Sequence, residues 1–368
     1  VRFWTKFLFD RGFIPVNEPA RRLVNQGMIQ GRSNFVYRIK DSNRFVSFNL
    51  KDKYDTTPIH VDVNIVENDV LDINEFKKWR AEYADAEFVL EDGKYIVGAE
   101  VEKMSKSKGN VIDPLELIKK YGADALRFTL MSMASPGRDV KLSEERVKGY
   151  RNFLTKIWNV SRFCETNNCN SNLETNVNNL KLEVNQWIIN EYIQTKKNID
   201  KHINALRFDE ASREIYNFVW NTFCDWYLEF AKSIFYSNDN DAIKETKLIF
   251  GFLFSNILIS LHPFIPFVTE ELWNKLKFID FYKSPLINFV NKNEFKIIKN
   301  NNIKMINWLI KIVCLIRSTK VLLQVSPGNF VDICIDSLSQ NKKDQEYRLL
   351  TRNIVFRFNS FITIDNSL

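Results

Sequence analysis

The chain has 368 residues, 45% of them hydrophobic, and its formal net charge is +7. This length and apolar content exclude an intrinsically disordered chain and allow two or more domains with buried cores. The excess of 52 lysines and arginines over 45 acidic residues is mild, so it is compatible with a nucleic-acid partner without requiring one. Five cysteines with no Cys-x-x-Cys pair indicate neither a disulfide framework nor a zinc site, and we expect a cytoplasmic protein.

Glycine divides the sequence, because nine of the eleven glycines lie at or before Gly149. This distribution predicts a turn-rich, mixed α/β first part and a mostly helical second part. In the first part we predict strands at residues 45–48, 59–63 and 87–90, with a hairpin turn at residues 91–94.

Helices follow from Pro114 onward. Two short helices are predicted over residues 114–133, separated at Gly122, and Ser143 should cap a long helix that reaches about Glu165. Apolar residues then recur every three or four positions, as on one face of a helical bundle. This spacing predicts amphipathic helices over residues 181–201, 207–236, 241–262 and 269–277.

The end of the chain is less regular. We predict a helix near residues 303–317, then a weak strand pair at residues 320–325 and 331–335. The uncharged stretch 248–268 contains Pro263 and Pro266, so it is too short a helix for a bilayer and we expect no membrane contact.

The most informative stretch is the lysine loop, which we define as residues 103–110, Lys-Met-Ser-Lys-Ser-Lys-Gly-Asn. A helix start follows it, with Asp113 at the capping position, Pro114 at the first helical position and Glu116 where a capping-box acid belongs. Several ammonium groups beside a helix N-terminus suit the binding of phosphates.

The lysine loop, the Val-Ile-Asp-Pro that follows it and Tyr-Gly-Ala-Asp-Ala-Leu-Arg at residues 121–127 together resemble the class I aminoacyl-tRNA synthetases that charge branched aliphatic amino acids. Residues 103–107 match that family's Lys-Met-Ser-Lys-Ser motif at every position. The resemblance implies the α/β end of a Rossmann-type catalytic domain followed by an all-α anticodon-binding helical bundle.

The resemblance also implies a chemistry. In this family an amino-acid carboxylate attacks the α-phosphate of ATP, with Mg²⁺ present, and pyrophosphate leaves. Lysines that close over the leaving group stabilise the transition state more than the ground state. By this resemblance Lys106 is the main catalytic phosphate contact and Lys103 the second, while Ser105 and Ser107 shape the ATP-binding loop; a solvated role is expected for Lys108.

Two further observations concern the ATP site. Gly27 and Met28 resemble the family segment that lies beside the adenine, although a strand leaving a turn is an equally good interpretation. The three histidines, His60, His202 and His262, form no His-x-Gly-His motif, so we expect this chain to lack the first half of the active site. None of them indicates a metal site, and His262 is interpreted as a helix-end residue.

The helical part is expected to contact tRNA through basic and aromatic side chains. The competing interpretation is that the tryptophans belong to the core and the basic residues to a solvated face. The candidate residues are Arg151, Lys156, Arg162, Trp220, Trp226 and Lys232.

The resemblance has two parts. Residues 1–102 are most similar to leucyl-tRNA synthetases, and the chain from residue 103 onward is most similar to valyl-tRNA synthetases. We therefore expect valine and tRNA-Val as substrates of a monomeric enzyme, with leucine as the alternative, and we interpret the chain itself as a tRNA-binding piece that is inactive alone. A chimeric reading frame joined at the lysine loop is a further hypothesis.

The predicted organisation has four segments, beginning with the end of the catalytic domain and its β-rich insertion. Junction helices, the anticodon-binding bundle and a small α/β piece follow. Their predicted bounds are residues 1–113, 114–178, 179–300 and 301–368.

Overall fold

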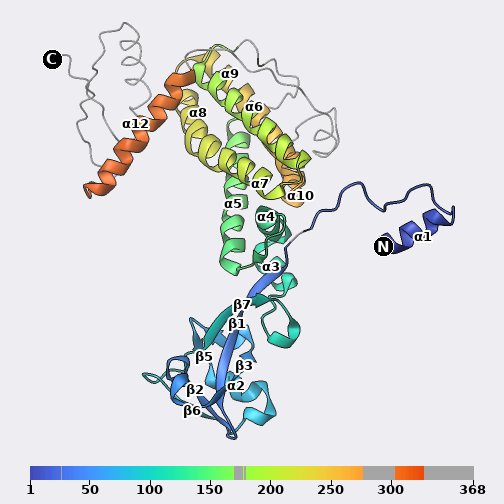
Figure 1. The fold of residues 1–368 in the computed structure, drawn as a ribbon. Helices are drawn as coiled ribbons and strands as arrows, with labels where there is room; N and C mark the ends of the chain where they lie inside the picture. Colours follow the sequence, from blue (N-terminus) through green and yellow to red (C-terminus); the bar gives the residue numbers. More distant parts are fainter. Residues whose placement is uncertain (26, 170–176, 178–179, 277–302, 327–368) are drawn as a thin grey trace, which may run out of the picture. The chain divides into compact units, whose positions relative to one another are not determined.

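The computed structural model describes residues 1–25, 27–169, 177, 180–276 and 303–326. The chain divides into two compact units, and the lysine loop belongs to the first. Unit 1 comprises Val1–Tyr150 with Ile203–Asp209, and unit 2 comprises Arg151–His202 with Glu210–Leu368. This division confirms an α/β first part and a helical second part (Figure 1).

Unit 1 is built around one long strand, β1 (Ile29–Ile39), at the centre of a six-stranded sheet. Strand β1 pairs antiparallel with β2, β3 and β7 and parallel with β8. The other strands are β2 (Arg44–Val46), β3 (Thr56–Val61), β6 (Glu87–Val89), β7 (Gly98–Lys103) and β8 (Val140–Lys141), with a separate pair β4 (Val66–Glu67) and β5 (Val70–Leu71).

The predicted strands at residues 45–48, 59–63 and 87–90 are confirmed as β2, β3 and β6. The predicted turn is also present, because Glu91 and Lys94 form an isolated antiparallel bridge around Asp92 and Gly93, both with positive φ. The sequence analysis missed β1, β7 and β8, as well as the short pair β4 and β5. Residues 30–34 of β1 are polar or glycine, and three of the six residues of β7 are charged.

The sheet holds an aromatic core. Phe45 on β2 is fully buried and lies 5.1 Å from Phe76 and 5.4 Å from Tyr83, measured between ring centroids. Phe76 and Tyr83 stack on each other at 4.9 Å, and they come from helix α2 (Ile73–Trp79) and the turn η3 (Ala81–Tyr83). This cluster lies wholly within residues 36–97, before the lysine loop, and makes them a folded module.

Short helices complete unit 1. Asp113 accepts a hydrogen bond from the Leu115 amide and Pro114 is the first residue of α3 (Pro114–Tyr121), as predicted. Gly122 separates α3 from α4 (Ala123–Met133), again as predicted. The remaining elements are α1 (Arg2–Asp10), η1 (Phe48–Lys53), η2 (Val63–Ile65) and η4 (Lys106–Lys108).

The described residues of unit 2 form helices joined by turns, and α5, α6 and α7 each begin or end in unit 1. The predicted amphipathic helices are present, with bounds shifted by a few residues. They are α5 (Glu144–Thr166), α6 (Glu183–Asn204), α7 (Phe208–Asn217), η6 (Phe218–Tyr227), α8 (Leu228–Phe235), α9 (Asn240–Leu261), α10 (Pro266–Lys275) and α12 (Ile303–Leu322).

Helix α9 forms the core of unit 2, since its residues from Ile249 to Leu261 are buried. The segment η6 is a π-helix that brings the Phe223 ring to 5.1 Å from Phe250 on α9. The uncharged stretch at residues 248–268 is therefore the largely buried second half of α9, the turn that follows it and the first residues of α10. Within the described part of the chain, no helix has the length and apolarity needed to cross a membrane.

One prediction at the end of the chain is wrong. Residues 320–322 are the last turn of α12 and not the start of a strand. The buried residues Ile306, Leu309, Val313 and Lys320 recur at helical spacing, so helical packing overrides the β-branched composition. The second predicted strand, residues 331–335, lies outside the described residues.

Replacing Phe45 by alanine should lower the stability of unit 1 by about 3–5 kcal/mol, because the change leaves a cavity among packed rings. Native-state hydrogen exchange of the β1 and β2 amides measures this unit separately from the helical unit. The control is Tyr54→Ala, since Tyr54 is 41% exposed and its loss should change stability by less than about 0.5 kcal/mol. Equal protection in the two variants would contradict the assigned core.

Candidate functional site

The lysine loop is continuous with strand β7 and closes beside the start of β1. Gln30 pairs with Lys103 at the end of the β1–β7 ladder, and the Met104 amide then donates to the Ile29 carbonyl at 3.2 Å. Residues 106–108 form a short 3₁₀ turn that ends at Gly109, whose φ is +62°. The sheet thus fixes where the loop begins, and glycine provides the left-handed residue that reverses it.

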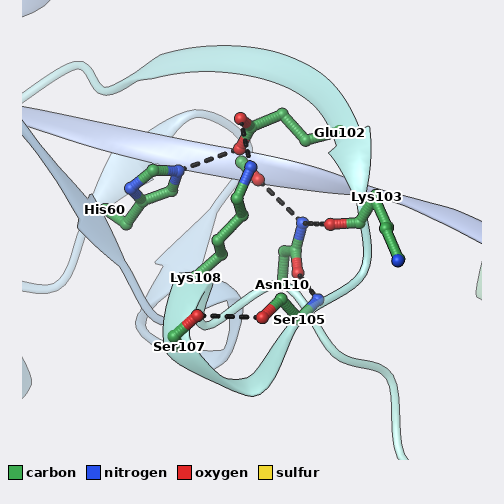
Figure 2. A network of polar contacts seen from close by, with 8 residues as sticks. His60, Glu102, Lys103, Ser105, Ser107, Lys108 and Asn110 are labelled. Atoms are coloured by element: carbon green, nitrogen blue, oxygen red, sulfur yellow. Dashed lines mark hydrogen bonds and ion pairs between the residues drawn. The ribbon is translucent and has the colours of Figure 1, made fainter.

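Asn110 fastens the loop to the sheet. Its side chain is 1% exposed, its Oδ1 accepts from the Ser105 amide at 2.7 Å, and its Nδ2 donates to Ser33 Oγ at 2.8 Å and to the Lys103 carbonyl at 3.2 Å (Figure 2). Three hydrogen bonds from one buried amide satisfy both ends of the loop and the centre of β1. The sequence analysis did not single out Asn110.

Two glycines allow this close approach. A Cβ on Gly31 would lie 2.5 Å from the Asn110 carbonyl oxygen, so the loop backbone occupies the space of that side chain. A Cβ on Gly109 would lie 3.0 Å from the Asp62 Cα, and the Gly109 carbonyl accepts from the Val63 amide at 3.0 Å. The loop therefore packs against β1 on one side and the end of β3 on the other.

Lys108 is paired with an acidic residue. Its Nζ donates to Glu102 Oε1 at 2.6 Å, and His60 Nε2 lies 2.9 Å from Glu102 Oε2 (Figure 2). The Glu102 side chain is 23% exposed. Lys108, for which a solvated role is predicted, is thus about one-third exposed and bound by a carboxylate on β7.

These hydrogen bonds lower the pKa of Glu102 to about 2, with the contribution of Lys108 first, then Ser33 and His60. The carboxylate is consequently charged at neutral pH. Because its pKa is lower in the folded state, it contributes stability above its ordinary pKa of 4.5, and this contribution is lost as the pH falls from there toward about 2.

The other two lysines of the loop are exposed. Lys103 and Lys106 have no ion pair with any residue in the described part of the chain, and Figure 2 shows the Lys103 side chain pointing away from Glu102. The Ser105 and Ser107 hydroxyls lie 2.8 Å apart, so they bond to each other within the loop. The loop thus presents two free ammonium groups on a fixed base.

The segment at Gly27 and Met28 joins the same site. Asp139 accepts from the Met28 amide at 2.8 Å and from Gln30 Nε2 at 2.6 Å, which holds the start of β1 against the residues before β8. A Cβ on Gly27 would lie 1.7 Å from the Arg138 carbonyl oxygen, so only glycine fits here. Asp139 has the same kind of role as Asn110, and sequence reasoning missed both.

The candidate tRNA residues lie on the helices of unit 2, and four of the six have partners there. Lys156 Nζ lies 3.9 Å from the centroid of the Trp220 ring and 2.7 Å from Asp225 Oδ1, and Tyr216 stacks on the same tryptophan at 5.7 Å. Trp220 is therefore held by neighbours and is not an open platform for a base.

The remaining candidates divide in two. Arg317 lies 5.2 Å from the centroid of the Trp226 ring, and Lys232 is paired with Glu229 at 2.6 Å. In contrast, Arg151 and Arg162 are exposed on α5 without an ion pair to any described residue. These two arginines are the candidates most available to a phosphate backbone.

The histidines and acidic residues do not form a metal site. In the described ranges, no group of three or more His, Cys, Asp or Glu side chains could hold a metal ion. His262 follows α9, is 8% exposed, and its Nδ1 lies 2.8 Å from Thr269 Oγ1, as expected for a helix-end residue.

Comparison with known protein families gives two matches. Residues 87–143, which contain the lysine loop, match the family described as tRNA synthetases class I (I, L, M and V). Residues 185–335 match the family described as the anticodon-binding domain of tRNA ligase. The first match includes β6, β7, β8, α3 and α4, and the second includes the helices from α6 to α12 but not α5.

Individual relatives are of two kinds. The valine--tRNA ligase of Pelagibacter ubique is 50% identical over 246 residues, which is 67% of this chain and 28% of that protein. The valine--tRNA ligase of Zymomonas mobilis is 46% identical over 235 residues, which is 62% of this chain and 26% of that protein. The leucine--tRNA ligase of Phocaeicola vulgatus is 44% identical over 275 residues, 75% of this chain and 26% of that protein. The chain thus spans about a quarter of the length of these relatives. The leucine-type match is longer than residues 1–102, so it continues beyond the start of the lysine loop.

Replacing Gly31 by alanine should displace the lysine loop, since the new methyl group meets the Asn110 carbonyl. Overpacking of this kind costs about 1–3 kcal/mol. A cost of about 1.4 kcal/mol raises the population of the opened loop about tenfold. Limited trypsin cleavage after the loop lysines should therefore become about tenfold faster. Gly149→Ala is the matched control, because a Cβ there meets nothing within 4 Å, and unchanged cleavage of both variants would contradict the described packing.

Proposed function

The chain belongs to the class I aminoacyl-tRNA synthetases, and on that premise we propose that it takes part in the ATP-dependent attachment of valine to tRNA-Val. The observation that carries the proposal is the division of charge in the lysine loop. Lys108 is neutralised by Glu102, while Lys103 and Lys106 remain exposed above a base fixed by Asn110.

The two exposed lysines suit the first chemical step. When the amino-acid carboxylate attacks the α-phosphate of ATP, negative charge grows on the departing pyrophosphate. Ammonium groups that meet this charge stabilise the transition state more than the ground state. We assign this catalytic role to Lys106 and Lys103, with Ser105 and Ser107 shaping the loop around the phosphates.

The rest of the ATP site contributes shape. Gly27 and Met28 would lie beside the adenine, where the exposed Met28 side chain would contact the planar ring while Gly27 lets the backbone pass close to the Arg138 carbonyl. Mg²⁺ would enter bound to the ATP phosphates, as it commonly does with nucleotides. No cluster of three or more acidic, histidine or cysteine ligands exists among the described residues, so no step of this proposal runs through a protein-bound metal.

The helical bundle is the proposed tRNA-binding part. Arg151 and Arg162 would neutralise phosphates directly, because both are exposed on one helix. Lys156, Trp220 and Trp226 would contribute through their present clusters, in which a cationic group lies over an aromatic ring, and Lys232 through its pair with Glu229. A cytoplasmic monomer that receives its amino acid and tRNA from solution is the setting we propose.

Valine is the proposed amino acid, and leucine is the alternative. Support for valine comes from the 50% identity to the Pelagibacter enzyme, and support for leucine from the 44% identity over a longer stretch in the Phocaeicola enzyme. ATP–pyrophosphate exchange measured separately with valine and with leucine distinguishes the two. Exchange that depends on leucine and not on valine would overturn the first choice.

A second candidate function is that of a tRNA-binding module without adenylation activity. The observation that favours it is the absence of a His-x-Gly-His motif from this sequence, which holds only three histidines. The 368-residue chain should then bind tRNA in a salt-dependent manner and show no exchange by itself. Turnover by this chain alone would contradict that interpretation.

Lys106→Ala, made in a longer version that supplies the His-x-Gly-His motif, should lower the rate of ATP–pyrophosphate exchange about 100-fold. This is the effect of removing one donor to a developing anion, about 3 kcal/mol. Affinity for tRNA should change less than twofold. Lys119→Ala removes an exposed lysine from α3 and serves as the control. Equal losses of exchange and tRNA binding in the Lys106 variant would count against its role.

Replacing both Arg151 and Arg162 by alanine should weaken tRNA binding by the 368-residue chain and flatten its salt dependence. Each lost phosphate contact should reduce the slope of log affinity against log salt by about 0.7–0.9. Filter binding at several salt concentrations measures both effects. Arg213→Ala is the control, since Arg213 is exposed on α7 and already pairs with Glu210. A slope that does not change would remove these arginines from the interface.

A further inference from the structure

A carboxylate lies at the base of the loop that we propose for polyanion binding. Glu102 immediately precedes Lys103, and an acidic group there disfavours a triphosphate by simple electrostatics. The described contacts supply a reason for its presence. Glu102 binds Lys108 on one oxygen and His60 on the other, so it joins the loop to the folded module in front of it.

The contact between Glu102 and Lys108 closes the loop into a ring. These residues flank positions 103–107, and their side-chain atoms are 2.6 Å apart. Inside this ring the Lys108 amide donates to the Ser105 carbonyl at 3.0 Å, and the Ser105 amide donates to Asn110 at 2.7 Å. The ion pair therefore restrains both limbs of the loop at their base and leaves the tip with its exposed lysines.

Glu102 is itself restrained by two strands. It pairs with Gly31 in the β1–β7 ladder, and its carboxylate contacts His60 on β3, which in turn pairs with Phe35 on β1. The His60 ring also packs against Phe35 at 4.5 Å between centroids. With about a quarter of its side chain exposed, Glu102 is held firmly enough to act as a fixed point rather than as a mobile surface charge.

We propose that Glu102 is a positioning residue for the lysine loop. Its carboxylate withdraws Lys108 from the phosphates and fixes the loop base, so that Lys103 and Lys106 meet the departing pyrophosphate in one defined arrangement. Glu102 touches neither substrate nor reacting atoms and acts through the loop. This inference rests on the proposed function, because it concerns how that site is held.

The first test needs only the 368-residue chain and no ligand. Glu102→Gln keeps the size of the side chain and removes its charge, so the amides of Ser105, Lys108 and Gly109 should exchange with deuterium about three- to tenfold faster. Glu100→Gln is the matched control, because Glu100 is an exposed acid two residues earlier on the same strand. The charge-swapped double variant Glu102→Lys with Lys108→Glu should recover at least half of the lost protection. Wild-type exchange in Glu102→Gln would overturn the proposed restraint.

The second test measures positioning by kinetics, in the longer version with the His-x-Gly-His motif. Removing an acid beside a polyanion site should speed pyrophosphate exchange if only electrostatics matters. If Glu102 positions the loop, Glu102→Gln should instead slow exchange, with kcat about tenfold lower and the KM for ATP changed less than twofold. A faster or unchanged kcat would overturn the proposal. If the unsubstituted protein shows no exchange at all, the proposed function fails and the positioning role falls with it, while deuterium exchange still reports whether the ion pair restrains the loop.

Discussion

The hydrogen bonds of one buried amide, Asn110, hold the candidate site together. Its side chain joins the Ser105 amide, the Lys103 carbonyl and Ser33 on β1, so the two limbs of the lysine loop and the sheet share one anchor. A buried amide left without these partners would cost about 1–3 kcal/mol, which gives the loop base a strong preference for this one arrangement. The exposed tip of the loop is not fixed in this way, because it makes few contacts and can adapt to a ligand.

Charge is distributed unevenly over this frame. Three lysines in six residues repel one another, and the structure relieves that repulsion by pairing Lys108 with Glu102. The pairing comes from the strands of the preceding module, since Ser33 and His60 complete the surroundings of the carboxylate. The residues before Lys103 and those after it therefore meet in one polar network.

Sequence reasoning was most successful where the signal is local. The helix start at Asp113 and Pro114, the turn at Gly93 and the amphipathic bundle helices all follow from short-range rules, and the structure confirms them. It failed where distant residues decide the outcome. Strand β1 is polar over residues 30–34 and becomes the centre of the sheet through partners tens of residues away. Tertiary packing likewise sets the pairing of Lys108 with Glu102 and the contacts that cover Trp220. The motif therefore identifies the three lysines but does not show which of them is paired with an acid.

The central claim is that the ammonium groups of Lys103 and Lys106, and not that of Lys108, bind the departing pyrophosphate. An experimental structure of a longer version with the His-x-Gly-His motif, bound to a non-hydrolysable ATP analogue, tests it most directly. Our account predicts both Nζ atoms within about 3 Å of β- or γ-phosphate oxygens, as charge-assisted hydrogen bonds require, with Lys108 still on Glu102. A triphosphate bound by Lys108 while Lys103 and Lys106 remain in solvent would contradict it.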